Sequence, residues 1–98
     1  MRDISQILRI SEDDGEVIYI GYPLSVTATE KKLLKLFLES DGGISSREIC
    51  EAMGLDPEKS RNAVAVHVCH INNKSLVVGG RRLISDAVMG VYRINEFL

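Results

Sequence analysis

One stretch of the chain, beginning at Arg61 and ending at Lys74, concentrates side chains whose chemistry suits contact with a nucleic acid. Asn62 and Asn73 carry amides that can pair with adenine, and the imidazole of His70 can donate to a base or a phosphate. The two cations at the ends of the stretch can hold a phosphate backbone. These residue types predict an interface that reads DNA rather than a catalytic centre.

The apolar residues of the same stretch have helical spacing, and we expect a helix over residues 60–74. At about 100° per residue, Val64, Val68 and Ile71 form one stripe that can dock on the rest of the protein. The opposite side holds an uncharged set that must face solvent or a partner: Asn62, Ala65, Val66, Cys69, His70 and Asn73.

Two interpretations of that exposed side stay open. Ala65 and Val66 can meet the methyl group of a thymine in the major groove. Together with Cys69 they also form an apolar patch that suits a protein partner or a second copy of the chain. Asn73 has an alternative role as well, because Asn72 and Asn73 can cap the end of the helix, and capping is the simpler interpretation.

Catalytic or metal chemistry has little support in the sequence. Cys50 and Cys69 are its only cysteines, and they lack the spacing of a zinc site or a disulfide framework. Cys69 adjoins His70, but neighbouring residues on a helix do not converge on one point. No nucleophile motif or glycine-rich phosphate loop is present. We therefore predict reduced thiols, no metal, no cofactor and no enzymatic activity.

The composition is that of an ordinary globular protein. With 98 residues, 45% hydrophobic and 27% charged, we expect a single domain over residues 1–98. No apolar run approaches the roughly 20 residues that a bilayer requires, and the first residues lack an apolar leader. We therefore expect a cytoplasmic protein that does not enter the membrane.

Charge is divided unevenly along the chain. The total is −2, but residues 1–56 hold six Lys/Arg against eleven Asp/Glu, which gives −5. Residues 57–98 hold six against three, which gives +3. If the protein touches DNA, the second half must make the contact.

The residues before the expected helix predict its scaffold. Apolar segments 4–10 and 16–25 flank the turn at Asp14-Gly15, which indicates a small antiparallel sheet of about three strands. Thr27 and Glu30 have the spacing of a capping box, so a first helix should begin there.

A second helix should follow, with Ser45 or Ser46 as its N-cap. The residues that we expect on its inward side are Ile49, Ala52 and Met53. Two consecutive amphipathic helices with a short connection are the arrangement of a helix-turn-helix.

Beyond the stretch, residues 76–84 read as a hairpin with Gly79-Gly80 as its turn. Arg81 and Arg82 would then lie on this hairpin and could contact the DNA backbone, or simply be solvated charges. Residues 91–94 predict one further strand.

Several blocks of the sequence together resemble the C-terminal effector domain of OmpR/PhoB-type response regulators. The blocks are a strand segment, VTATEKKLLKL at 26–36, ISS at 44–46, VAVHVCHIN at 64–72 and VYRI at 91–94. The resemblance covers essentially the whole chain. It implies an α+β winged helix-turn-helix with a four-stranded N-terminal antiparallel sheet, three helices and a C-terminal hairpin as the wing. It also implies transcriptional control in a two-component phosphorelay. These 98 residues do not include the receiver domain that usually precedes this domain, so we expect either a stand-alone regulator or a piece of a longer protein.

The departures from the family pattern fall where that family touches DNA. The basic residues on the recognition helix of that family correspond here to four neutral residues, Cys69, His70, Asn72 and Asn73. Only Lys74 retains a charge. In the wing, Asp86 replaces a threonine and Val88 an arginine. Each phosphate contact that is lost means that one counterion fewer is released from the DNA on binding, which lowers the affinity. We therefore expect weak, salt-sensitive binding to double-stranded DNA.

Our leading hypothesis is a DNA-binding transcriptional regulator with the helix of residues 60–74 in the major groove. The predicted DNA-binding residues are Arg61, Asn62, Val66, His70, Asn73, Lys74, Arg81 and Arg82. The alternative is a degenerate winged helix that binds a protein, or its own copy, through Ala65, Val66 and Cys69.

Overall fold

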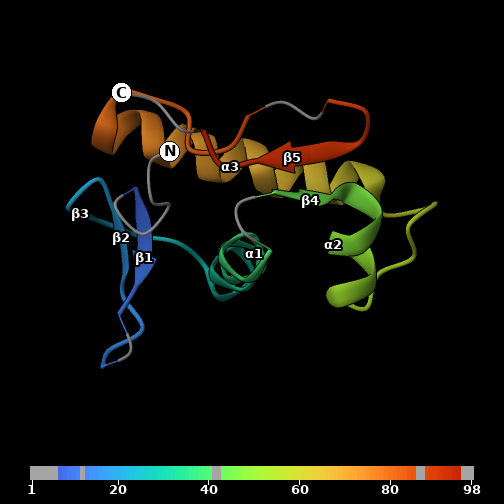
Figure 1. Ribbon diagram of the computed structural model, residues 1–98, viewed down its shortest axis with the longest axis horizontal. Coiled ribbons are helices and arrows are strands. Elements are labelled where there is room, and N and C mark those ends of the chain that lie inside the picture. The colour runs from blue at the N-terminus through green and yellow to red at the C-terminus, as the bar shows by residue number, and fades with distance from the viewer. Residues whose placement is uncertain (1–6, 12, 41–42, 86–87, 96–98) are drawn as a thin grey trace.

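The computed structural model describes residues 7–11, 13–40, 43–85 and 88–95 (Figure 1). Its elements are β1 (Leu8–Ile10), β2 (Val17–Tyr19), β3 (Tyr22–Leu24), α1 (Ala28–Glu39), β4 (Gly43–Ser45), α2 (Ser46–Ala52), α3 (Arg61–Gly79) and β5 (Val91–Arg93). α2, a loop and α3 follow in sequence, and a hairpin lies beside α3. The fold is therefore an α+β winged helix-turn-helix, as the sequence predicts.

The N-terminal sheet has the antiparallel strand order β1-β2-β3. Leu8 pairs with Tyr19, and Val17 pairs with Leu24. These four side chains are buried because alternate residues of a strand point to the same face, which here packs on the core. Among the described residues the sheet has these three strands, without the fourth that the family resemblance implied; residues 4–6, also expected in a strand, lie outside the described part.

Both short-range helix starts are confirmed. The Thr27 hydroxyl accepts from the Glu30 backbone N–H at 3.1 Å, and the Glu30 carboxylate accepts from the Thr27 N–H at 2.9 Å. Ser45, rather than Ser46, caps α2 through the same arrangement with Glu48. Each box satisfies two N–H groups that a helix start otherwise leaves unpaired.

The prediction for the inward side of α2 is wrong in part. Ile49 is buried and the half-buried Met53 packs against the core, both as expected, but Ala52 is exposed and the second buried residue is Cys50. The helix has only seven residues and packs on α3, and Cys50, next to Ile49, takes the inward place that was expected for Ala52.

Helix α3 is longer than the sequence suggested. Its docking stripe is confirmed, because Val64, Val68 and Ile71 are all buried. However, the helix does not end at Lys74: it continues through Leu76–Val78 to Gly79, so the predicted hairpin over residues 76–84 is wrong.

The Gly79-Gly80 pair ends α3 instead of turning a hairpin. Gly80 adopts φ 72°, and its N–H donates to the Leu76 carbonyl, as in a left-handed helix C-cap. Asn72 and Asn73 therefore lie inside the helix, and their predicted capping role is also wrong.

The wing lies further along the chain, between Leu83 and Asn95. The Ser85 N–H donates to the Arg93 carbonyl, and the Asn95 N–H donates to the Leu83 carbonyl, each at 2.8 Å. The returning strand, β5, also pairs with β4, placing Ile44 opposite Tyr92. The wing is thus anchored on one side to the segment that leads into α2 (Figure 1).

Two tight turns place a large apolar residue at positive φ. Ile20 (φ 50°) precedes Gly21 in the β2–β3 turn, and Met89 (φ 54°) precedes Gly90 at the wing tip. Such two-residue turns favour Asn-Gly, because positive φ brings Cβ close to the following carbonyl oxygen; glycine has no Cβ, and asparagine compensates with local hydrogen bonds from its short polar side chain. The Ile20 side chain lies beside Gly79 in the last turn of α3. A Cβ atom at Gly79 would meet the Ile20 Cδ1 at 3.4 Å. Met89 is 97% exposed.

Replacing Met89 with asparagine is therefore expected to raise the free energy of unfolding, by about 0.5–1 kcal/mol. The change relieves the strain at positive φ and removes no packing, because the side chain is exposed. Urea denaturation of the two proteins measures the difference. A decrease in stability would show that the methionine packs against the protein in solution.

Candidate nucleic-acid interface

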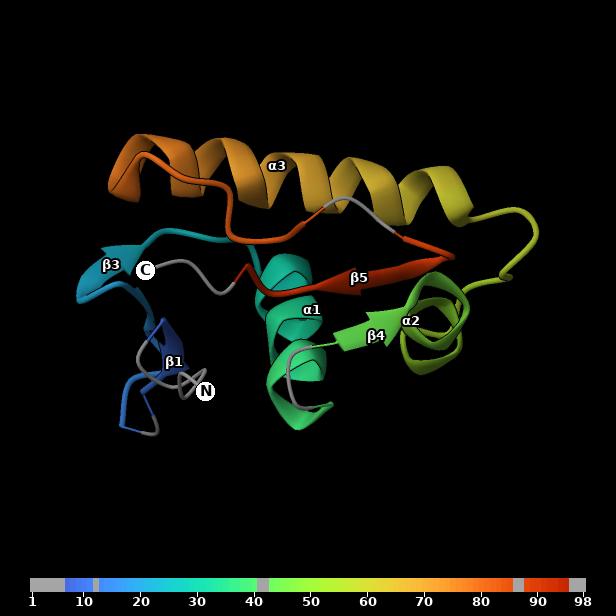
Figure 2. The ribbon, with the colours of Figure 1, turned by 45° about the horizontal axis from the view of Figure 1, so that its top comes forward.

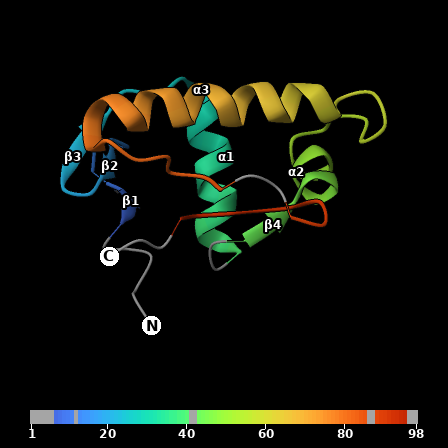
Figure 3. The same cartoon turned by 90° about the horizontal axis from the view of Figure 1, so that it is seen from above.

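Helix α3 runs across one end of α1 and is exposed along its length. Figures 2 and 3 show its N-terminal end above α2 and its C-terminal end above the β1-β2-β3 sheet. The whole set that the sequence placed opposite the docking stripe is exposed: Asn62, Ala65, Val66, Cys69, His70 and Asn73. Of the predicted DNA-binding residues, Asn62, Val66, His70 and Asn73 thus share one face.

Arg81 and Arg82, two of the predicted cations, do not lie on that face, and the side chain of Arg61 lies outside the described part of the structure. Arg61 is the first residue of α3, whereas Arg81 and Arg82 follow its last turn, about 28 Å away at 1.5 Å per residue. Arg81 and Arg82 are exposed but lie before the wing rather than in its turn. The Arg81 carbonyl accepts from the Tyr19 hydroxyl at 3.2 Å, and the Arg82 carbonyl accepts from the Asn95 side-chain amide at 2.8 Å. These bonds fix the segment between α3 and the wing to the sheet and to the wing.

Lys74 points away from the shared face and pairs with Glu30. Its ammonium group donates to the Glu30 carboxylate oxygen that also accepts from the Thr27 N–H. The Glu30 side chain is only 3% exposed, and that of Lys74 is 36% exposed. This contact joins α3 to the start of α1 across 44 positions of sequence.

Opposing effects act on the pKa of Glu30. Burial favours the neutral acid and raises it, but the hydrogen bonds from Lys74 and Thr27 and the charge of Lys74, with a smaller effect of His70, outweigh burial. The pKa of Glu30 therefore lies below its ordinary value, and the carboxylate is charged at neutral pH.

A pair of buried polar residues on α3 holds the wing. The Asn72 side chain donates to the Ile84 carbonyl at 2.9 Å and accepts from the Ile84 N–H at 2.8 Å. The Ser75 hydroxyl accepts from the Leu83 N–H at 2.9 Å and donates to the Asn72 carbonyl. We call Asn72 and Ser75 the wing clamp. Sequence reasoning missed it, because two polar residues near the end of a helical stretch are also typical of a cap.

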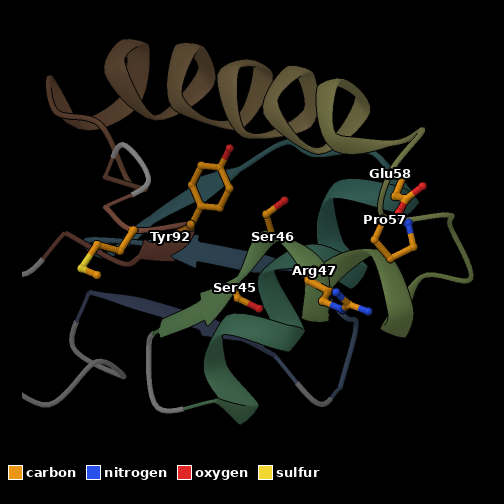
Figure 4. A pocket seen from close by; sticks show the side chains of 8 residues that line it. Ser45, Ser46, Arg47, Pro57, Glu58 and Tyr92 are labelled. Carbon is orange, nitrogen blue, oxygen red and sulfur yellow. The ribbon is translucent and has the colours of Figure 1, made fainter.

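Two grooves meet at Tyr92 of the wing. One, of about 280 Å³, runs between α3 and the wing and is lined by Ala65, Cys69, Asn73, Leu76 and Arg82 among others. The second, of about 630 Å³, lies between the wing tip, the start of α2 and the α2–α3 loop (Figure 4). Figure 4 shows Ser46, at the start of α2, and Tyr92, in β5, extending into this second groove. Pro57 and Glu58 lie on its far side.

The exposed face of α3 is apolar as well as polar. Val66 and Leu76 are each about half exposed, and Val77 is 88% exposed. Because Lys74 is occupied by Glu30, the described side chains between Asn62 and Val77 that face solvent carry amide, imidazole, thiol and aliphatic groups. This surface can make base-edge or apolar contacts, but it offers few contacts to phosphates.

Other kinds of site are not formed by the described residues. Within them, no group of three or more His, Cys, Asp or Glu side chains could hold a metal ion. Cys50 is buried, Cys69 is exposed, and both are free thiols. None of the described helices is long and apolar enough to span a membrane.

The sequence matches no protein-family model, and no curated protein is significantly similar to it. Its structure is similar to one described under "A novel family of redox sensors in the streptococci evolved from two-component response regulators". The superposition has a TM-score of 0.70 and 24% sequence identity, and it covers 99% of this chain. The two proteins share a fold. This chain spans 41% of the length of that sensor.

Proposed function

We propose that this chain is a winged-helix domain that binds double-stranded DNA, with the exposed face of α3 in the major groove, and acts in transcriptional control in the cytoplasm without catalysis. The observation that carries the proposal is that Asn62, Val66, His70 and Asn73 are all exposed and lie on one face of α3, opposite the stripe that packs on the core. Amide and imidazole groups suit base edges, and valine suits a thymine methyl. The fold shared with a sensor derived from response regulators supports it.

Few cations remain for the phosphate backbone. Lys74 pairs with Glu30, and the other cations of the predicted set are Arg61, Arg81 and Arg82. For each phosphate contact, a tenfold rise in salt concentration should lower the logarithm of the binding constant by about 0.9. Three arginines therefore predict a slope of about −3, which is shallow for a specific DNA-binding protein.

A salt titration with a pool of short random-sequence duplexes tests this value. The double variant Arg81→Ala, Arg82→Ala should reduce the slope by about two units. Arg9→Ala is the matched control, because Arg9 is an exposed arginine of the distant sheet and should leave the slope unchanged. Failure of the unaltered protein to bind any duplex at low salt would refute the proposed function.

A second candidate function is binding to a protein partner, including another copy of the chain. The exposed Ala65, Val66 and Cys69, extended by Leu76 and Val77, favour it because apolar side chains gather at the centres of protein interfaces. Sedimentation at increasing concentration tests self-association, and Val66→Glu should abolish it. A monomer at all concentrations would leave only a different protein as the partner.

A further inference from the structure

The wing tip holds an exposed methionine at a turn position that favours asparagine or glycine, and no packing inside the protein accounts for that choice of residue. Ile20 and Met89 occupy the same position in equivalent turns, at φ 50° and 54°. Ile20 is 36% exposed and lies close to Gly79 in the last turn of α3, so part of its side chain contacts the protein. Met89 is 97% exposed and its neighbour Val88 is 71% exposed. A strained, apolar, solvent-facing tip points to a contact outside the chain.

The tip is held firmly in place. Val88 and Val91 exchange two backbone hydrogen bonds of 3.0 and 3.1 Å across the turn. The Ser46 N–H at the start of α2 donates to the Gly90 carbonyl at 2.9 Å, which fastens the turn to the helix-turn-helix. Met89 is therefore presented on a rigid support, and little further ordering is needed when it binds.

The tip also stands next to donors for a phosphate backbone. The groove beside it is lined by the polar residues Ser45, Ser46, Arg47 and Tyr92, with Glu58 as its one acidic residue (Figure 4). The Arg47 guanidinium is largely exposed, although it contacts Glu51 at 3.3 Å. The same Tyr92 lines the groove along α3, so the surface proposed for the duplex continues to the wing tip.

We propose that Met89, supported by Val88, is an apolar wedge that enters the minor groove and partly unstacks one base step, so that the bound duplex is kinked. This inference rests on the proposed function and adds to it a deformation of the DNA. Exposed methionine, leucine and similar side chains act in this way in proteins that bend DNA, with nearby polar groups holding the adjacent phosphates. A wedge needs no positive charge, which fits a wing with Val88 where the related family has an arginine.

The test compares Met89→Asn with the unaltered protein on duplexes selected from the random pool. Binding by the variant should be about tenfold weaker, with an unchanged salt slope, because an apolar contact releases no counterion. Energy transfer between dyes on the two ends of the duplex should report a bend with the unaltered protein and a straighter duplex with the variant. Because asparagine suits this turn, weaker binding cannot come from a failure to fold.

Ile20→Asn is the matched control, since it makes the same change in an equivalent turn at the opposite end of α3, and it should leave both readouts unchanged. Equal affinity and equal bending by Met89→Asn, or a straight duplex in the complex with the unaltered protein, would overturn the wedge alone. If the unaltered protein binds no duplex at low salt, the proposed function and the wedge both fail.

Discussion

Replacing Lys74 with methionine is expected to lower the free energy of unfolding at pH 7 by about 2–4 kcal/mol. Removing one partner of a buried ion pair costs about 3–5 kcal/mol, and the value here is reduced because the lysine side chain is 36% exposed and water can partly replace it. Glu30 would remain charged and buried beside α3. Denaturation in urea measures the loss, and Lys35→Met, at an exposed position on α1, is the control that should change little.

The same variant has a pH signature. In the unaltered protein the pKa of Glu30 is lowered, so its contribution to stability is present above its ordinary value of 4.5 and is lost as pH falls through the lower, folded-state pKa. Without Lys74, burial raises that pKa relative to the unaltered protein. The difference between the two proteins should therefore shrink as pH falls from 7 toward 4. A difference independent of pH would mean that Lys74 stabilises through packing of its aliphatic stem.

Replacing Asn72 with leucine is expected to destabilise the protein by about 2–4 kcal/mol. The variant leaves the Ile84 N–H and C=O without their side-chain partner, and each unsatisfied buried polar group costs about 1–3 kcal/mol. Leucine has the same branching as asparagine but is larger, so no cavity forms and overpacking adds to the loss. Chemical denaturation measures the loss of stability.

Asn73→Leu is the control for this prediction, because Asn73 is the exposed neighbour on the same helix and should shift stability by less than about 0.5 kcal/mol. The amide proton of Ile84 gives a second readout, since it should exchange faster with solvent in Asn72→Leu. Equal stability of the two variants would show that the wing does not depend on the wing clamp.

The sequence by itself determined the elements whose causes are local. The capping boxes at Thr27 and Ser45 join residues three positions apart, so their spacing is visible in the chain. The docking stripe of Val64, Val68 and Ile71 follows from helical periodicity, and the uncharged exposed face of α3 follows from the same periodicity. The winged-helix fold class could be predicted from these elements together with the family resemblance, although the wing was placed on the wrong residues.

Only the tertiary structure decided how the wing is made and what the polar residues of α3 do. A Gly-Gly pair permits positive φ both in a hairpin turn and at a helix C-cap, and the sequence cannot distinguish them until α3 packs against the sheet. Lys74 meets Glu30 across 44 positions, and Asn72 meets Ile84 across 12. A charged or amide side chain has the same local pattern whether it faces DNA or a buried partner, because its role depends on which distant segment folds against it.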